Sequence, residues 1–188
     1  MARHVIRALL PCDTSAFAAF ERDNREAYER FNEPHPDGYY SDAGLQQAFN
    51  RLLARQVAGR YETLIATGEK DSQWVAKGSL TVHSTAEGRF ARLVYQTDHQ
   101  HWKQGAGAAL LTDLLHRAQR MDLQRMEALI AADNLVSLHL LRRAGFRAVG
   151  WVAPAQLRRG PIDCLLLGRA VGSVDGWPLS RAHVHLPA

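Results

Sequence analysis

The chain has 188 residues, of which 46% are hydrophobic and 22% are charged, and its formal net charge is +4. This length is typical of one domain with a substantial core and excludes two sizeable domains. No apolar run approaches the roughly 20 residues of a membrane-spanning helix, and the basic residues are too scattered to form a nucleic-acid-binding arm.

The first third of the chain predicts one strand and two helices. A strand is expected over Val5–Leu9, and helical spacing of apolar residues follows over residues 14–31. Proline and glycine predict a loop over residues 32–38. A second helix is expected from Asp42 to Ala58, ending at Gly59.

The middle of the chain predicts consecutive antiparallel strands. Strands are expected over residues 61–67 and 73–83, separated by Gly68-Glu69-Lys70-Asp71. Ala86-Glu87-Gly88 predicts a hairpin turn into a third strand that ends at Thr97.

A glycine-containing loop, residues 102–108, follows this strand and opens a helix. The N-terminus of a helix leaves N–H groups without partners, and together with the helix dipole they bind anions such as phosphate. Lys103 adds a positive charge, and glycines at 105 and 107 avoid side chains that would hold a phosphate away. A Walker loop is excluded because Gly-Lys-Ser/Thr is absent, and a dinucleotide fingerprint would need glycine where Leu110 stands. A tight turn without a ligand is the alternative.

The last third predicts alternating helices and strands. We expect a helix over about residues 105–121, strands near 126–131, 148–153 and 162–169, and an irregular tail over 172–188. This order predicts an α+β fold, a sheet with helices on both faces.

A second motif lies between two of these strands, in residues 134–146, which read NLVSLHLLRRAGF. Asp133 or Asn134 can cap a short helix, and Gly145 can end it in a left-handed conformation. By itself this segment predicts a capped helix and nothing more.

Together the two motifs, about thirty residues apart, resemble the GNAT acetyltransferases. The match is to the family's Gln/Arg-x-x-Gly-x-Gly/Ala loop and its later Asn-x-x-Ser/Ala…Gly-Phe segment, with Trp102 in place of Gln or Arg. That departure, with Asp23-Asn24-Arg25-Glu26 and Tyr39-Tyr40, resembles the RimJ/RimL-like subgroup. The resemblance covers roughly residues 3–171.

The resemblance implies both a fold and a reaction. The fold would be a mixed, mostly antiparallel sheet of about six to seven strands, with strands four and five splayed apart at Thr97, in a domain of residues 1–171. The reaction would transfer the acetyl group of acetyl-coenzyme A (acetyl-CoA) to a primary amine. We expect direct attack in a ternary complex, because neither Cys12 nor Cys164 lies beside either motif.

The resemblance also implies site residues. Backbone N–H groups of the loop would hold the diphosphate, the end of the fourth strand would pair with the pantetheine arm, and Asn134 would reach that arm, unless Asn134 only caps its helix. Ser137 would be the catalytic acid, because the tyrosine of many members is Leu141 here, although a capping or surface serine is the alternative. We expect Tyr39 and Tyr40 to bind the acceptor. The expected cofactor-binding residues are Tyr95, Gln96, Thr97, Trp102, Lys103, Gln104, Gly105, Ala106, Gly107, Ala108 and Asn134.

The sequence identifies no general base, and the candidates nearest the loop are Asp98, His99 and His101. A free α-amine has a pKa of about 7.7–8.0 and is partly neutral at pH 7, whereas a lysine amine at about 10.4 is almost fully charged. A protein N-terminus is therefore the easier acceptor for an enzyme without a strong base. The alternatives are a small amine (an amino acid, polyamine or antibiotic), a non-catalytic domain that senses acetyl-CoA, and an unrelated nucleotide-binding protein.

Compartment and partners complete the expectations. The first residues lack a secretory signal, so we expect a cytoplasmic protein. The two cysteines form neither a metal pattern nor a Cys-x-x-Cys motif, so no metal site is expected. The expected partner is the amine acceptor, with no direct contact to nucleic acid or membrane, and a homodimer is left open.

Overall fold

Seven strands form one mixed sheet in the computed structural model, which describes residues 4–68, 73–86 and 88–171. In this part of the chain the strands lie in the order β1-β2-β3-β4-β5-β7-β6, and β4 with β5 is the parallel pair. The strands are β1 (His4–Ala8), β2 (Tyr61–Gly68), β3 (Trp74–Thr85), β4 (Gly88–Thr97), β5 (Arg125–Ala131), β6 (Arg147–Leu157) and β7 (Gly160–Ala170). The expected α+β class with a mostly antiparallel sheet is confirmed. The tail expected over residues 172–188 lies outside the described residues.

The last two strands are longer than the sequence pattern predicted. Pro154 ends the expected strand at residue 153, because proline cannot donate to a sheet ladder. The structure accommodates this proline at an irregularity between Val152 and Ala155, where the register of β6 against β7 shifts. Strand β6 therefore continues to Leu157.

Helices flank the sheet, and one expected helix is in fact two. They are α1 (Thr14–Asp23), α2 (Arg25–Glu29), α3 (Asp42–Val57), α4 (Ala106–Arg120) and α5 (Leu135–Arg143), with 3-10 turns η1 (Pro11–Asp13) and η2 (His99–His101). The single helix expected over residues 14–31 is interrupted at Asn24, whose buried amide group donates to the carbonyl of Phe20 and to Asp98. Asparagine competes with helical hydrogen bonding in this way.

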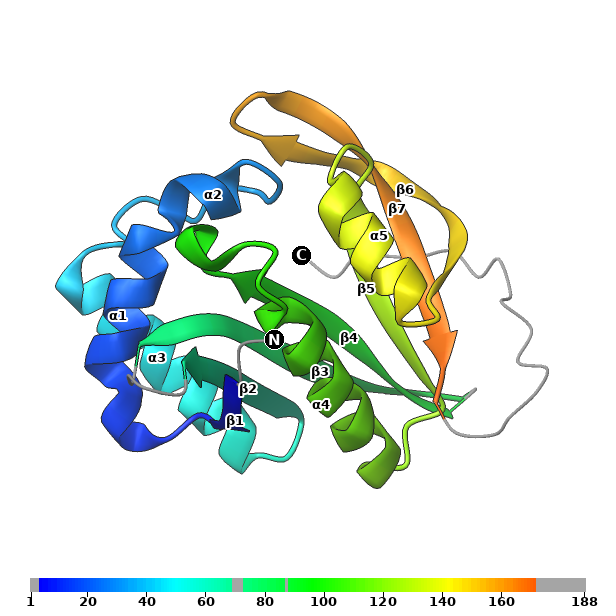
Figure 1. Ribbon diagram of the computed structural model, residues 1–188, viewed down its shortest axis with the longest axis horizontal. Coiled ribbons are helices and arrows are strands. Elements are labelled where there is room, and N and C mark those ends of the chain that lie inside the picture. Colours follow the sequence, from blue (N-terminus) through cyan, green and yellow to red (C-terminus); the bar gives the residue numbers. More distant parts are fainter. Residues whose placement is uncertain (1–3, 69–72, 87, 172–188) are drawn as a thin grey trace.

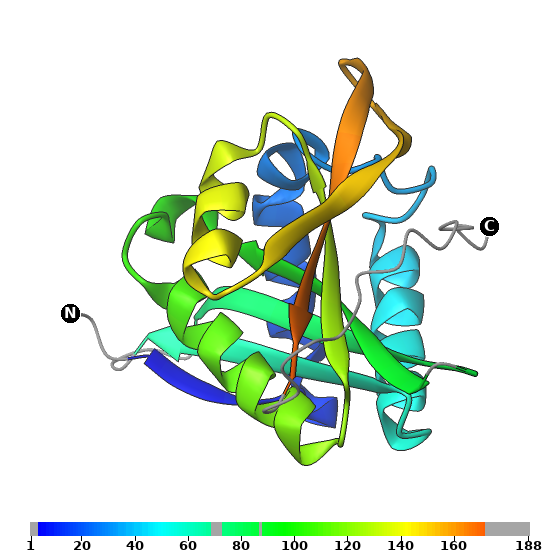
Figure 2. The ribbon, with the colours of Figure 1, turned by 90° about the vertical axis from the view of Figure 1, so that its right-hand side faces the viewer.

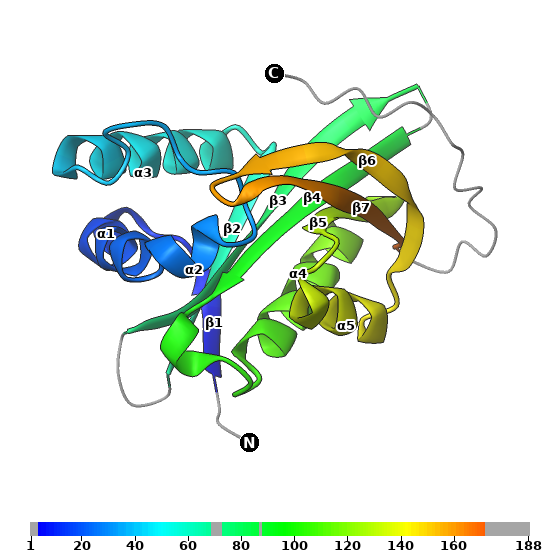
Figure 3. The same ribbon diagram turned by 90° about the horizontal axis from the view of Figure 1, so that it is seen from above.

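Each face of the sheet has its own core. Helices α1 and α3 cover one face, and α4 and α5 cover the other (Figures 2 and 3). On the first face Phe17 packs against Phe49 and Trp74, with ring centroids 5.4 and 6.4 Å apart. On the second face Gly78 lets α4 approach closely, since a Cβ atom there would lie 2.8 Å from the side chain of Leu114. None of the described helices has the length and apolar character needed to cross a membrane.

The sheet opens in its middle. Strands β4 and β5 pair only over Phe90–Arg92 with Arg125–Glu127. Beyond Arg92 they diverge, as Figure 1 shows, and β4 continues against β3 alone to Thr97. The expected separation is confirmed, and it begins earlier than Thr97. From Leu93 onward the edge of β4 that faces β5 has no strand partner in the described chain.

Candidate functional site

The loop beside this opening adopts an anion-binding shape. Gly105 is the N-cap of α4 with a φ of 92°, and Lys103 has a φ of 63°, so both are left-handed. The first bond of the helix runs from the N–H of Ala109 to the carbonyl of Gly105. The three preceding N–H groups therefore have no partner within the helix. Gly105 itself is exposed, and a Cβ atom there would meet nothing within 4 Å.

Gly107 has a role that the sequence interpretation missed. A Cβ atom there would lie 2.9 Å from the Thr97 hydroxyl oxygen and 3.4 Å from the Leu140 side chain. This glycine therefore lets the start of α4 pack against β4 and α5, in addition to any space it leaves for a ligand. A substitution at Gly107 would disturb the protein itself.

Three of the expected site residues, Tyr95, Asn134 and Ser137, lie close together at the opening. Asn134 caps α5, because its side-chain oxygen accepts from the N–H of Ser137 at 3.2 Å. The pKa of Tyr95 is raised, because burial raises it more than an interaction with the Ser137 side chain lowers it. The Tyr95 hydroxyl is nevertheless buried without a hydrogen-bond partner of normal geometry. Leu141, which stands where many family members have tyrosine, is fully buried in the core.

The end of β4 presents further polar groups. The side-chain oxygen of Gln96 is buried without a partner. The carbonyl of Thr97 accepts from the indole N–H of Trp102 at 3.1 Å, while the Trp102 side chain remains 46% exposed. Trp102 thus secures the loop to the end of β4, and its ring remains available at the surface.

A buried network that the sequence did not reveal joins this loop to the first helices. Asn24 donates to Asp98 at 3.3 Å and accepts from the backbone N–H of His99 at 2.8 Å. Asp98 also accepts from the N–H of Gln100 at 2.7 Å. Asp98 was a candidate base, but its carboxylate is committed to these contacts. The sequence feature that could have revealed this network is Asn24, an asparagine in the middle of a helical pattern.

On the opposite face of the sheet, Tyr39 belongs to a second buried network. Its hydroxyl donates to Glu21 at 3.3 Å, and Glu21 forms an ion pair with Lys77 of β3. Burial lowers the pKa of Lys77 to about 7, and the neighbouring Glu21 carboxylate favours its charged form. Lys77 is the register partner of Gln96, so this network reaches the strand next to the opening.

Aromatic rings surround Tyr39. The ring of His35 stacks on Tyr39 and on Tyr28, with centroid separations of 3.7 and 4.9 Å. Tyr40 meets Tyr39 edge-on at 5.0 Å, and the guanidinium of Arg25 lies 4.5 Å above the Tyr40 ring. Tyr39 and Tyr40, the expected acceptor-binding residues, are thus held in one rigid cluster.

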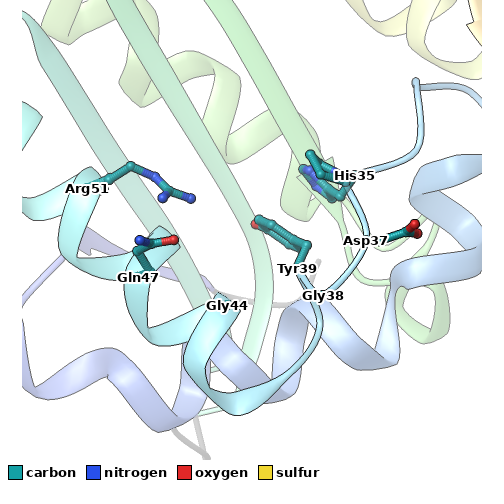
Figure 4. Close-up of a pocket in the computed structure, with 8 residues that line it drawn as sticks. His35, Asp37, Gly38, Tyr39, Gly44, Gln47 and Arg51 are labelled. Atoms are coloured by element: carbon teal, nitrogen blue, oxygen red, sulfur yellow. The ribbon is translucent and has the colours of Figure 1, made fainter.

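A pocket of about 430 Å³ lies between the loop of residues 35–39 and α3 (Figure 4). Its walls are formed by His35, Pro36, Asp37, Gly38, Tyr39, Gly44, Gln47 and Arg51. No sequence motif pointed to Gln47 or Arg51. They become neighbours of Tyr39 only through the packing of the loop on the helix.

The hairpin of β6 and β7 contacts α2 and so connects the two sides of the opening. Arg158 forms an ion pair with Glu29 and thereby lowers the pKa of that carboxyl group. The neighbouring Arg159 donates to the carbonyl of Arg30 and pairs with Asp133, beside the cap of α5. These contacts fix the first helices relative to α5.

The arrangement fits a long ligand with an anionic end. Unpaired N–H groups at α4 suit a diphosphate. The free edge of β4 suits a chain of amides, and the unpartnered polar atoms of Tyr95 and Gln96 lie on the same segment of that strand. Coenzyme A has both of these chemical features, so the residues present fit acetyl-CoA.

Comparison with known proteins identifies the class. The chain matches a family model described as an acetyltransferase (GNAT) domain over residues 3–147. The protein therefore belongs to the GNAT acetyltransferase family, which confirms the resemblance. No curated protein matches the sequence.

Solved structures share the fold at low sequence identity. A ribosomal-protein-S5-alanine acetyltransferase from Vibrio fischeri is 13% identical with a TM-score of 0.84, over 94% of this chain and 97% of that one. RimJ from Mycobacterium smegmatis, in complex with CoA-disulfide, is 19% identical with a TM-score of 0.77, over 92% and 84%. A Salmonella typhimurium enzyme that modifies the N-terminal serine of ribosomal protein L7/L12 is 18% identical with a TM-score of 0.76, over 89% and 95%. These neighbours agree with the RimJ/RimL-like resemblance.

Proposed function

We propose that this protein transfers the acetyl group of acetyl-CoA to the α-amine of a protein N-terminus. Membership of the GNAT family supports the acetyl transfer. The observation that carries the cofactor site is the separation of β4 from β5 after Arg92, beside the open N-terminus of α4.

The cofactor residues divide into two groups. The backbone N–H groups of Gln104–Ala108, with Lys103, hold the diphosphate. Each charge-assisted hydrogen bond contributes about 1.5–3 kcal/mol, so a few of them supply much of the roughly 8 kcal/mol of micromolar binding. The free edge of Tyr95–Thr97 pairs with the pantetheine amides. Asn134 contributes its side-chain N–H₂ group, because its oxygen already caps α5.

Ser137 and Tyr95 act on the leaving group. As the acceptor amine attacks the thioester carbonyl, a C–N bond forms and the C–S bond breaks, which leaves a thiolate. Ser137 donates a proton to that sulfur, and the neighbouring Tyr95 hydroxyl replaces the proton. The raised pKa of Tyr95 keeps its proton in place at neutral pH. The proton lost by the amine passes to water, and Tyr95 regains its own proton from that water, so that both side chains return to their starting state.

Two observations favour a protein N-terminus as the acceptor. Asp98 is occupied by its contacts to Asn24 and Gln100, so it is not a free base, and an α-amine needs less help to lose its proton than a lysine. The neighbours from Vibrio fischeri and Salmonella typhimurium are described as acting on ribosomal proteins, the latter on an N-terminal serine. Tyr39 and Tyr40 contact the acceptor.

Release of free thiol from acetyl-CoA tests this function against a panel of amines. The panel contains lysine-free peptides with a free N-terminus, N-terminally blocked peptides with one lysine, and small amines. We expect turnover of the free N-termini, with mass spectrometry locating the acetyl group on the α-amine. Turnover of small amines alone would support the small-molecule alternative, and tight binding of acetyl-CoA without any turnover would support a sensing domain.

A further inference from the structure

The pocket beside Tyr39 has walls fixed by close packing. Gly44, Gln47 and Arg51 lie on one side of α3, and the loop of residues 35–39 forms the other wall. A Cβ atom at Gly44 would collide with the carbonyl oxygen of Gly38, so the loop rests directly on the helix. The pocket is therefore a built feature of the fold.

The pocket presents a cation without a counterion. Figure 4 shows Arg51 and Gln47 extending from α3 toward Tyr39. Arg51 forms no ion pair with any residue that the structure describes, and its nearby charge lowers the pKa of Tyr39 against the larger effect of burial. Asp37, the carboxylate among the lining residues, points away from Arg51 in Figure 4 and interacts with the charge of Arg158.

The other wall, apart from the outward-pointing Asp37, adds shape without further charge. His35 is stacked between two tyrosine rings, and burial lowers its pKa, so it is neutral at pH 7. The hydroxyl of Tyr39 is already used by Glu21. The groups left for recognition are the guanidinium of Arg51 and the amide of Gln47. A guanidinium fork matches a carboxylate in geometry and charge.

The pocket lies within reach of the acetyl-transfer site along the sheet. Tyr39 connects through Glu21 to Lys77 of β3, and Lys77 pairs with Gln96 of β4 beyond the separation. This path comprises the side chains of Tyr39, Glu21 and Lys77 and one strand spacing. An extended peptide covers such a path with a few residues at about 3.3 Å each.

We propose that Arg51 and Gln47 bind a side-chain carboxylate among about the first four residues of the acceptor, so that N-termini carrying Asp or Glu there are preferred. The inference rests on the proposed function, because it assumes a peptide acceptor. It adds a substrate class that neither the family nor its structural neighbours specify.

Matched peptides test this preference. Lysine-free peptides with Glu at position 2, 3 or 4 are compared with the same peptides carrying Gln, and kcat and KM are measured by thiol release. We expect kcat/KM up to about fivefold higher for Glu at one of these positions, through a lower KM, because Arg51 is exposed and solvent weakens its pairing with a carboxylate. Arg51→Gln should remove this difference by raising the KM of the Glu peptides to that of the Gln peptides.

Arg120→Gln is the matched control, because it removes the same charge from an exposed position at the far end of α4. It should retain the preference for Glu. Equal rates for Glu and Gln peptides, or equal loss of preference in Arg51→Gln and Arg120→Gln, would overturn the carboxylate site while leaving the proposed function in place. If no peptide of either kind is acetylated, the proposed function itself fails, and the carboxylate site fails with it.

Discussion

The two sides of the opening in the sheet differ in the chemical groups that form them. The proposed cofactor side, formed by β4, the loop before α4 and the start of α5, relies on backbone N–H groups, glycines and a helix cap. The proposed acceptor side, formed by α1, α2, α3 and the β6–β7 hairpin, relies on long side chains such as the Glu21–Lys77 and Glu29–Arg158 pairs. Backbone groups suffice for a cofactor that is the same in every turnover. Selection among different acceptors requires side chains.

The largest effect is expected on the cofactor side, from Gly107→Asp. The added carboxylate at the start of α4 repels the diphosphate, and its Cβ atom lies 2.9 Å from the Thr97 hydroxyl oxygen, which is too close for normal packing. Loss of about two charge-assisted bonds of 1.5–3 kcal/mol each weakens acetyl-CoA binding roughly 100-fold or more. Calorimetry measures the affinity, and we also expect a lower Tm. Unchanged affinity would remove this loop from the binding site.

Ala108→Asp is the control that separates the effect of a negative charge at the start of α4 from the effect of disturbed packing at Gly107. Ala108 is exposed in the first turn of α4, where an acidic side chain favours the helix dipole. The variant should keep or slightly raise Tm and still bind acetyl-CoA more weakly. Undiminished binding in this variant would show that Gly107→Asp acts by disrupting the packing alone.

The next largest effect is expected on turnover, from Ser137→Ala and Tyr95→Phe. General acid catalysis contributes roughly 100-fold or more, so kcat should fall to that extent in Ser137→Ala with little change in KM for acetyl-CoA. Tyr95→Phe should also lower kcat with little change in Tm, because the Tyr95 hydroxyl has only its interaction with the Ser137 side chain to lose. A Tyr95→Phe variant with normal kcat and reduced Tm would assign this hydroxyl to structure alone.

A smaller effect is expected where the two sides are joined, from Asn24→Ala. The change removes the buried Asn24 amide and leaves the part-buried N–H of His99 without its acceptor, which costs about 1 kcal/mol in the free energy of unfolding. KM should rise for both acetyl-CoA and acceptor, because the contact to Asp98 links α1 to the cofactor loop. Asn24→Asp keeps the acceptor for His99 and places a carboxylate beside Asp98, so its defect should diminish as pH falls. If neither KM changes in either variant, Asn24 does not couple the two sides.

The last effect is expected from pH. Below the acceptor's pKa of about 7.7–8.0, kcat/KM should rise about tenfold per pH unit and then level off, since only the neutral amine attacks. Burial holds the pKa of Tyr95 above its usual value, so this acid stays protonated and causes no decline up to about pH 10. Steady-state rates from pH 6 to 10 measure the profile. A fall in activity below pH 9 that disappears in Tyr95→Phe would contradict this assignment.

The sequence by itself determined the features that depend on neighbouring residues. The glycine at position 105 specifies a left-handed N-cap, Asn134 caps its own helix, and Gly145 ends it with a φ of 86°. Apolar periodicity placed most strands and helices to within a few residues. Such preferences act over one or two turns of chain, so a single sequence reveals them.

Tertiary structure alone decided the features that join distant segments. Asn24 meets Asp98, and Glu21 meets Lys77, only because α1 packs on the sheet at one particular place. The same holds for Arg51 beside Tyr39 and for Gly107 against Thr97. These contacts depend on how whole elements fill the space between them, and no local conformational preference encodes that.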